Sequence, residues 1–265
     1  MGTLRDFELA GWQDAAPTYD GFAGATRLFV PALVQAAGEA AGRRVLDIAC
    51  GTGVAAQAAA DAGAHVTGVD FSAAMLAMAR SLHPDIAFQA GDAEQLPFAD
   101  RSFDAVISNF GVHHVEHPER AIAEARRVLA PGGTLAFTVW AASADNTAWR
   151  IIFDAVRACG RLDVPMPAGN DASATRENFA RLMVQAGFDP ATLRSELLAH
   201  DWLLPEGADL VSIFETGTVR MATLLRGQGS ALPAVREHVA TALQARRRNG
   251  AIALPTRAWL ISAQT

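Results

Sequence analysis

The segment from Val45 to Gly53 has the residue types of a cofactor-binding turn. Its sequence, VLDIACGTG, is an apolar run that ends in glycines, and an alanine-rich stretch follows. The apolar run predicts a strand buried on both faces of a parallel sheet, and the alanines predict a helix. Gly51 and Gly53 would then form a strand-to-helix turn, where a ligand can approach the backbone and meet free N–H groups of the helix N-terminus.

Asp47, within this segment, bears on the kind of cofactor. The spacing Gly51-x-Gly53-x-x-Ala56, with Asp70 as an acid at the end of the next predicted strand, satisfies the dinucleotide-binding fingerprint. That interpretation would make the chain an NAD(P)-dependent oxidoreductase. However, an acid at the end of the strand would repel a pyrophosphate and suits a cationic ligand. Asp47 therefore favours a positively charged cofactor.

The elements that must position these residues alternate along the chain. The hydrophobic pattern predicts strands near 44–49, 65–70, 86–91, 103–109 and 134–140, and helices near 53–62, 72–82 and 118–129. Pro118 and Glu119 favour the start of the last helix, and Pro131-Gly132-Gly133 is expected to end it. The alternation predicts a parallel sheet with helices on both faces, whose ligands bind beyond the carboxyl ends of the strands.

Five segments in this order resemble motifs of the class I S-adenosylmethionine (SAM) dependent methyltransferases. They are VLDIACGTG at 45–53, HVTGVDFS at 65–72, GDAEQLPF at 91–98, SFDAVISN at 102–109 and RRVLAPGGTL at 126–135. Their wording is similar to the group of ubiquinone and menaquinone biosynthesis methyltransferases. The resemblance implies a Rossmann-like α/β fold, with a seven-stranded, mostly parallel sheet whose last strand is antiparallel. It also implies SAM as the cofactor and S-adenosylhomocysteine as its product.

The resemblance also implies a division of the chain. Residues 1–42 would form an N-terminal helical lid, and 43–140 the SAM-binding core. Two insertions, at 141–174 and 205–250, would form a helical cap that builds the acceptor pocket. The core would continue at 175–204 and end with a strand in 251–265.

Roles for cofactor-binding residues follow from the same resemblance. Asp47 would orient the ammonium group of SAM, while Gly51 and Gly53 let the backbone approach its methionine portion. Asp70 would accept hydrogen bonds from both ribose hydroxyls. Asp92 would accept from the adenine amine, although an Asp at this position could instead cap a turn. The expected set is completed by Tyr19 at the SAM carboxylate, the Ala93 N–H at the adenine ring, Phe71 and Met75 beside the adenine, and Ala49 and Asn109.

His113 and His114 follow the fourth predicted strand, close to where the transferred methyl group should emerge. Either histidine could deprotonate a phenol, enol or hydroxyl at neutral pH. The alternative is that both are structural and pack against the cofactor. An activated methyl group needs mainly alignment and exclusion of water for in-line displacement, so a base is required for only some acceptors.

The acceptor is expected to be a small molecule. The loop Ser108-Asn109-Phe110-Gly111 lacks the Asn-Pro-Pro-aromatic element with which related enzymes methylate nitrogen in DNA or protein. Large apolar side chains could form an apolar or aromatic pocket, although each could equally belong to the core. These candidates are Trp12, Trp140, Trp149, Phe153, Phe214 and Met221.

Composition excludes several other classes. The formal net charge of −6 gives no general attraction to nucleic acid, and the run Arg246-Arg247-Arg248 suits a solvated helix end. The chain contains no lysine, which excludes a P-loop lysine, a pyridoxal phosphate Schiff base and the lysine of short-chain dehydrogenases.

Cysteine usage and hydropathy suggest the surroundings of the protein. Two cysteines, Cys50 and Cys159, provide neither a disulfide framework nor a metal site, and no apolar run approaches a membrane span. These features predict a cytoplasmic protein without a metal. A protein of the same fold that binds SAM without transferring a methyl group stays open as an alternative.

Overall fold

A computed structural model describes residues 2–169, 174–248 and 250–265 of the chain. Residues 170–173, which belong to the predicted insertion at 141–174, lie outside the described residues, as do Met1 and Asn249.

One mixed sheet runs through the molecule, in the order β3-β2-β1-β4-β5-β8-β6, with β7 paired to β8. Strands β3, β2, β1, β4 and β5 are parallel, whereas β8 is antiparallel to both β5 and β6. This confirms the predicted Rossmann-like α/β fold with its antiparallel last strand. The strands are β1 (Arg44–Ile48), β2 (His65–Asp70), β3 (Ala87–Ala90), β4 (Phe103–Asn109), β5 (Leu129–Trp140), β6 (Arg194–Pro205), β7 (Arg247–Arg248) and β8 (Ala251–Gln264).

Two details of the sheet differ from the sequence prediction. The sheet has eight strands rather than seven, because the two residues of β7 pair with the start of β8. Strand β5 begins at Leu129 rather than 134, since Leu129 is already extended and pairs with Phe103. The glycine turn that was expected to separate helix from strand is an irregularity within β5, where the register shifts and Gly132 has a φ of +75°.

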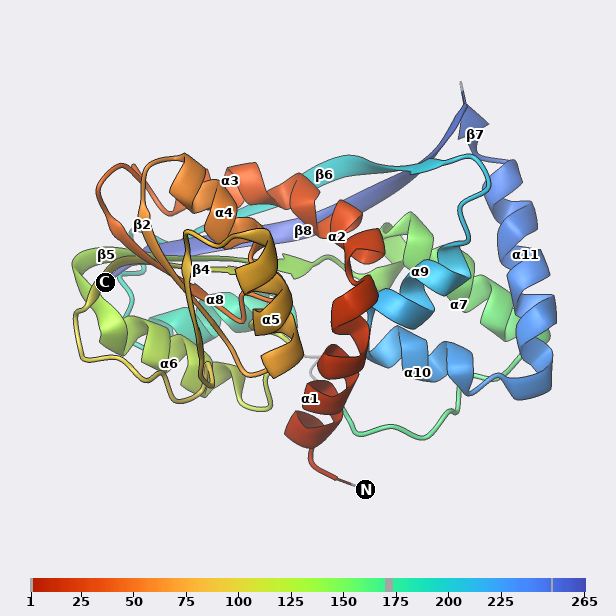
Figure 1. The fold of residues 1–265 in the computed structure, drawn as a ribbon, viewed down its shortest axis with the longest axis horizontal. Helices are drawn as coiled ribbons and strands as arrows, with labels where there is room; N and C mark the ends of the chain where they lie inside the picture. Colours follow the sequence, from red (N-terminus) through yellow and green to blue (C-terminus); the bar gives the residue numbers. More distant parts are fainter. Residues whose placement is uncertain (1, 170–173, 249) are drawn as a thin grey trace.

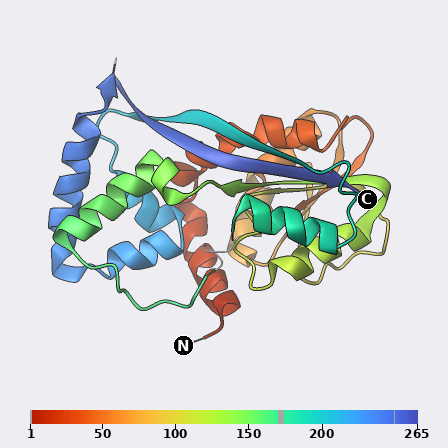
Figure 2. The same ribbon diagram turned by 180° about the vertical axis from the view of Figure 1, so that it is seen from behind.

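Helices cover both faces of the parallel part of the sheet (Figures 1 and 2). On one face, α6 and α8 bury Ile122 and Phe179 against Phe137 of β5. On the other, α3 and α4 bury Leu33 and Ala59 against Ile107 of β4. The helices of this part are α3 (Val30–Ala36), α4 (Val54–Asp61), α5 (Ala73–Leu82), α6 (Pro118–Val128) and α8 (Arg176–Gln185).

A second group of helices packs on the far end of the β6–β8 hairpin, away from the parallel strands (Figure 1). The hairpin pairs from Arg194 with Ser262 to Pro205 with Ala251, and its outer half carries Trp202 and Leu254 into this second core. These helices are α2 (Asp20–Thr26), α7 (Thr147–Cys159), α9 (Leu210–Gly217), α10 (Arg220–Arg226) and α11 (Leu232–Gln244).

Helix α1 (Leu4–Ala15) lies between the two groups and contacts both α5 and α9 (Figure 1). Its N-terminus is fixed by a capping box between Thr3 and Asp6. Gly11 permits the approach to the second group, because a Cβ there would lie 2.3 Å from Val219 Cγ1. Four short 3₁₀ turns complete the described elements, at Ala16–Thr18, Arg27–Phe29, Ser143–Asp145 and Gly229–Ala231.

Asn146 is a buried polar link between the segment after β5 and strand β8. Its Oδ1 accepts hydrogen bonds from Thr256 Oγ1 at 2.9 Å and the Arg257 N–H at 2.8 Å, while its Nδ2 donates to the Ala141 carbonyl at 3.1 Å. Asn146 is only 1% exposed and Thr256 only 2%, so the hydrogen bond between these side chains has little access to water.

We expect Asn146→Ala to lower the free energy of unfolding by about 2–3 kcal/mol, because the groups that bonded Asn146 lose their partner in the interior. Urea denaturation followed by circular dichroism measures this loss. Gln13→Ala, an exposed amide on α1, is the control and should change stability by less than about 0.5 kcal/mol. Equal effects of the two substitutions would contradict the structural role of Asn146.

Candidate functional site

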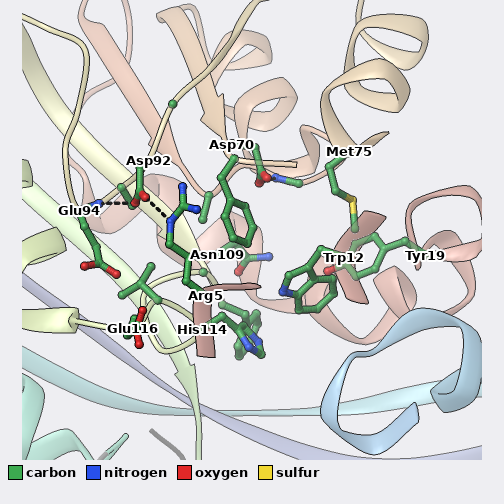
Figure 3. Close-up of a pocket in the computed structure, with 18 residues that line it drawn as sticks. Arg5, Trp12, Tyr19, Asp70, Met75, Asp92, Glu94, Asn109, His114 and Glu116 are labelled. Carbon is green, nitrogen blue, oxygen red and sulfur yellow. Dashed lines mark hydrogen bonds and ion pairs between the residues drawn. The ribbon is translucent and has the colours of Figure 1, made fainter. Parts of the chain in front are cut away.

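A pocket lies at the carboxyl ends of the parallel strands, with α1 along one side (Figure 3). Its walls come from the turns after β1, β2, β3 and β4, from the start of α5 and from the N-terminal segment. The lining residues are Arg5, Trp12, Tyr19, Ala49, Gly51, Asp70, Phe71, Met75, Gly91, Asp92, Ala93, Glu94, Asn109, Phe110, Gly111, His114, Val115 and Glu116.

The glycine turn after β1 exposes its backbone to this pocket. Gly51 has a φ of +54°, and a Cβ at that position would meet no atom within 4 Å. Gly53 has a φ of +84°, and a Cβ there would lie 2.7 Å from the Phe88 ring. The two glycines thus serve different needs: Gly51 leaves space at the pocket, whereas Gly53 permits the turn to pack on β3.

Two residues without glycine's freedom have positive φ angles beside the pocket. Ala49, after β1, has a φ of 51°, and Phe110, after β4, has a φ of 58°. A left-handed conformation costs a residue with a side chain about 1–2 kcal/mol, and such strain gathers at functional sites. The two turns also approach closely, since a Cβ on Gly111 would lie 2.6 Å from Ala49 Cβ.

Asp47, on β1, is a buried carboxyl group without a hydrogen-bond partner. It is 1% exposed, and neither oxygen is hydrogen bonded within the described part of the chain. Burial raises the pKa of Asp47 to about 8, and the negative charge of Asp70 adds to this rise. The nearby Ala56 N–H lowers the pKa in part, although its geometry is not that of a hydrogen bond. A buried acid of this kind is stabilised by a cation.

Asp70 ends β2 and connects it to the glycine turn. Its Oδ2 accepts from the Gly51 N–H and its Oδ1 from the Ser72 N–H, both at 2.8 Å. Burial raises the pKa of Asp70 to about 6, although these N–H groups favour the ionised form. Each oxygen keeps a further lone pair for a ligand hydroxyl.

Asp92, after β3, is engaged from two sides. Its Oδ1 accepts the Glu94 N–H at 2.9 Å, which is the turn-capping role considered from the sequence, and its Oδ2 binds Arg5 Nε at 2.9 Å (Figure 3). Sequence reasoning missed Arg5, because a single arginine in an N-terminal helix has no motif that places it beside β3.

His114 lies in the pocket beside α1, whereas His113 does not line it. His114 Nδ1 is 3.3 Å from Oε2 of Glu8, and the same oxygen accepts Trp12 Nε1–H at 3.0 Å. His113 is buried, its Nδ1 has no partner among the described residues, and burial holds its pKa well below the usual value. Glu8 was also missed by sequence reasoning, although its spacing from Trp12 places both on one helix face.

Nine of the eleven predicted cofactor residues line this pocket, whereas Asp47 and Gly53 do not. Some polar atoms of the lining residues are already hydrogen bonded within the protein. Asn109 Nδ2 donates to the Thr26 carbonyl at 3.2 Å and its Oδ1 accepts from Thr138 Oγ1 at 2.8 Å. Tyr19, a pocket residue, has its pKa raised by burial, so its phenol is neutral. The roles assigned to these residues stay predictions.

Of the predicted acceptor-pocket residues, only Trp12 lines the pocket. The others belong to the second hydrophobic core, where Phe214 is fully buried and Met221 is 8% exposed. Trp140 stacks on Phe110 with ring centroids 3.8 Å apart, and thus packs against a pocket residue. A role in acceptor binding stays a prediction for this group, which comprises Trp140, Trp149, Phe153, Phe214 and Met221.

Two negative findings apply to the part of the chain that the structure describes. No group of three or more His, Cys, Asp or Glu side chains there is arranged to hold a metal ion. None of the helices there has the length and apolar character needed to span a membrane.

Known proteins share the core that forms this pocket. Residues 46–137 match the family model described as a methyltransferase domain. A demethylmenaquinone methyltransferase from Renibacterium salmoninarum is 47% identical over 135 residues, which are 49% of this chain and 57% of that protein. A malonyl-[acyl-carrier protein] O-methyltransferase from Erwinia billingiae is 39% identical over 153 residues, which are 58% of each. The chain thus spans little more than half the length of these relatives.

The fold is also found in solved structures. A SAM-dependent methyltransferase from Mesorhizobium loti superposes with a TM-score of 0.51 and 20% identity over 89% of this chain and 96% of that one. At this identity the likeness shows the fold alone. With the family match, it confirms the resemblance predicted from the sequence, and SAM is the cofactor expected for such a domain.

The raised pKa of Asp47 predicts how stability depends on pH. The folded protein holds this proton up to about pH 8, whereas the unfolded chain releases it near pH 4. Between these values the folded state binds more protons, so the free energy of unfolding falls as pH rises. Asp47→Asn removes the titrating group and with it this pH-dependent loss of stability. The unfolding free energy of the variant minus that of the wild type should therefore increase from pH 4 to pH 8.

Urea denaturation without ligand at several pH values measures this difference. Asp85→Asn, an exposed acid at the opposite end of the sheet, is the control and should leave the pH profile unchanged. Parallel profiles for Asp47→Asn and wild type would show that Asp47 is ionised without penalty in the folded protein.

Proposed function

We propose, from the methyltransferase domain at residues 46–137, that this chain transfers a methyl group from SAM to a small-molecule acceptor. The observation that carries the proposal is the unpartnered carboxyl group of Asp47 beneath the glycine turn. SAM carries an ammonium and a sulfonium group, and a ligand of that charge stabilises the ionised form of a buried acid. A nicotinamide cofactor would present an anionic pyrophosphate at this turn and no cation that could stabilise the ionised carboxyl group, which disfavours the oxidoreductase alternative.

The residues around the pocket fit the other parts of SAM. Asp70 has lone pairs left for two ribose hydroxyls after it accepts the two backbone N–H groups. The neutral Tyr19 phenol can donate to the SAM carboxylate. Phe71 and Met75 line the same pocket and supply apolar surface for the adenine ring. Arg5 already holds Asp92 Oδ2, so the adenine amine would share this carboxylate with it.

The protein's contribution to the reaction would be alignment, exclusion of water and proton removal. SAM supplies a methyl group that is already activated on sulfur. Helix α1 covers the pocket through Arg5 and Trp12, which limits the access of water. His114 lies in the pocket, and its imidazole could deprotonate an acceptor hydroxyl.

The pocket favours an aromatic or quinol acceptor over a carboxylate. Trp12, Phe110 and Val115 provide apolar surface around His114. A carboxylate acceptor would require a cation that is not already paired. Among the described residues that line the pocket, the one arginine is Arg5, and it is paired with Asp92. The relative from Renibacterium is named for demethylmenaquinone, an acceptor of the favoured class. We therefore propose a hydroquinone or phenol as the acceptor of this chain.

Cofactor binding tests the first part of this proposal. SAM and S-adenosylhomocysteine should raise the melting temperature, whereas NAD and NADP should not. Asp70→Asn should weaken S-adenosylhomocysteine binding about 10- to 100-fold in calorimetry, because charge-assisted hydrogen bonds contribute about 1.5–3 kcal/mol. The control Asp85→Asn should bind normally. Stabilisation by NAD alone, or normal binding by Asp70→Asn, would contradict the assignment.

Methyl transfer requires a separate experiment. The protein is incubated with methyl-labelled SAM and a panel of reduced naphthoquinones, phenols and lipid acids, and products are identified by mass spectrometry. We expect label in a hydroquinone or phenol product. Binding of SAM without label transfer to any member would favour the alternative of a SAM-binding protein that does not methylate this class of compound.

A further inference from the structure

We propose that Glu8 is a positioning residue that holds His114 with Nε2 available as the base for an acceptor hydroxyl. This inference rests on the proposed function, because it assigns a proton acceptor to that methyl transfer. Glu8 lies on α1, outside the matched region at 46–137, so the N-terminal helix would take part in catalysis rather than only cover the pocket.

The geometry begins with a buried carboxylate shared by two donors. The Glu8 side chain is 2% exposed, and its Oε2 lies 3.0 Å from Trp12 Nε1 and 3.3 Å from His114 Nδ1. The Trp12 and His114 rings meet edge to face with centroids 5.0 Å apart. Trp12 therefore fixes both the carboxylate and the imidazole ring, and the three side chains form one unit.

This contact favours one tautomer of His114. A carboxylate beside Nδ1 favours a proton on that nitrogen, which leaves Nε2 with a lone pair. No hydrogen bond to Nε2 is formed within the described residues, and the His114 side chain is 25% exposed in the pocket. The carboxylate also stabilises the imidazolium that forms when Nε2 takes a proton.

The O–H bond of the acceptor breaks and its proton moves to Nε2 of His114. The electron pair left on the acceptor forms the bond to the methyl carbon. At the same time the carbon–sulfur bond of SAM breaks, and its electrons stay on sulfur. The imidazolium then releases its proton to water, which regenerates the base.

Other charged groups surround His114 and set the background of any titration. From α1 these are Glu8 and Arg5, from the histidine's own loop His113 and Glu116, and from the turns after β2 and β3 Asp70, Asp92 and Glu94. Arg5 and Asp92 neutralise each other. Glu8 is the acid of this group with an ion-pair contact to the His114 ring.

Nuclear magnetic resonance of the apo protein tests the positioning role without requiring methyl transfer. Long-range ¹H–¹⁵N spectra near pH 8 should show His114 protonated on Nδ1 and bare on Nε2; His114→Gln and His113→Gln assign the signals. In Glu8→Gln, which keeps an acceptor oxygen for Trp12, the pH midpoint of the His114 signals should fall by about 1 unit. Asp14→Asn, the same charge change on the exposed side of α1, should leave it nearly unchanged.

Kinetics then test the base, with the hydroquinone or phenol that accepts label. Glu8→Gln should lower kcat about 10- to 100-fold and shift the acid limb of the pH–rate profile to lower pH. The affinity for S-adenosylhomocysteine should stay constant. Trp12→Phe, which keeps an aromatic ring but removes the indole N–H that donates to Glu8, should shift the profile in the same direction by less. A purely structural Glu8 would change stability but not the profile.

The outcomes separate this inference from the proposed function. A bare Nδ1 on His114, or an unchanged midpoint in Glu8→Gln, overturns the positioning role whether or not label is transferred. Label transfer with an unchanged kcat in Glu8→Gln overturns the role of the Glu8–His114 pair in catalysis. The expected tautomer and midpoint shift without label transfer to any acceptor uphold Glu8 as a positioning residue and overturn the proposed function.

Discussion

The unpartnered carboxyl group of Asp47 is the constraint around which the site is arranged. Strand β1 lies inside the sheet, between β2 and β4, and the Asp47 side chain on it is 1% exposed, so this acid has almost no contact with water. The folded protein can keep this group either protonated or beside a cation. The glycine turn directly after it, with an open position at Gly51, is where a cationic ligand can approach. In our proposal, the stability of the protein and its affinity for the cofactor are linked through this one side chain.

The turns after β1 and β4 carry backbone strain beside the pocket. Ala49 and Phe110 both adopt left-handed conformations, and the two turns meet where Gly111 approaches Ala49. The stacked Phe110 and Trp140 rings hold the turn after β4 from behind. The second hydrophobic core therefore supports the pocket wall, even though most of its aromatic residues do not line the pocket.

Helix α1 contacts two separate parts of the pocket, the turn after β3 and the loop after β4. Arg5 reaches Asp92 after β3, and Glu8 with Trp12 reaches His114 after β4. In our proposals, the same helix touches the adenine end and the reacting end of the site. A displacement of the whole helix would therefore alter cofactor binding and proton removal together, whereas a substitution of Glu8 alone would affect only proton removal.

The sequence by itself determined the Rossmann-like sheet, the glycine turn and the resemblance to a methyltransferase domain, because these depend on local patterns: apolar strands of regular length, glycines at fixed spacing and acids at strand ends. It also placed Asp47, Asp70 and His114 near one sheet edge, since parallel strands end there together. Tertiary structure alone decided that Leu129 extends β5, because strand pairing with Phe103 outweighs the glycine turn. It also brought Arg5 and Glu8 to residues 87 and 106 positions away in the chain, and such contacts leave no local pattern. Likewise, the same large aromatic residue types occur in pockets and in hydrophobic cores. Only the packing of the folded chain could therefore show that Trp12 lines the pocket and Phe214 belongs to the core.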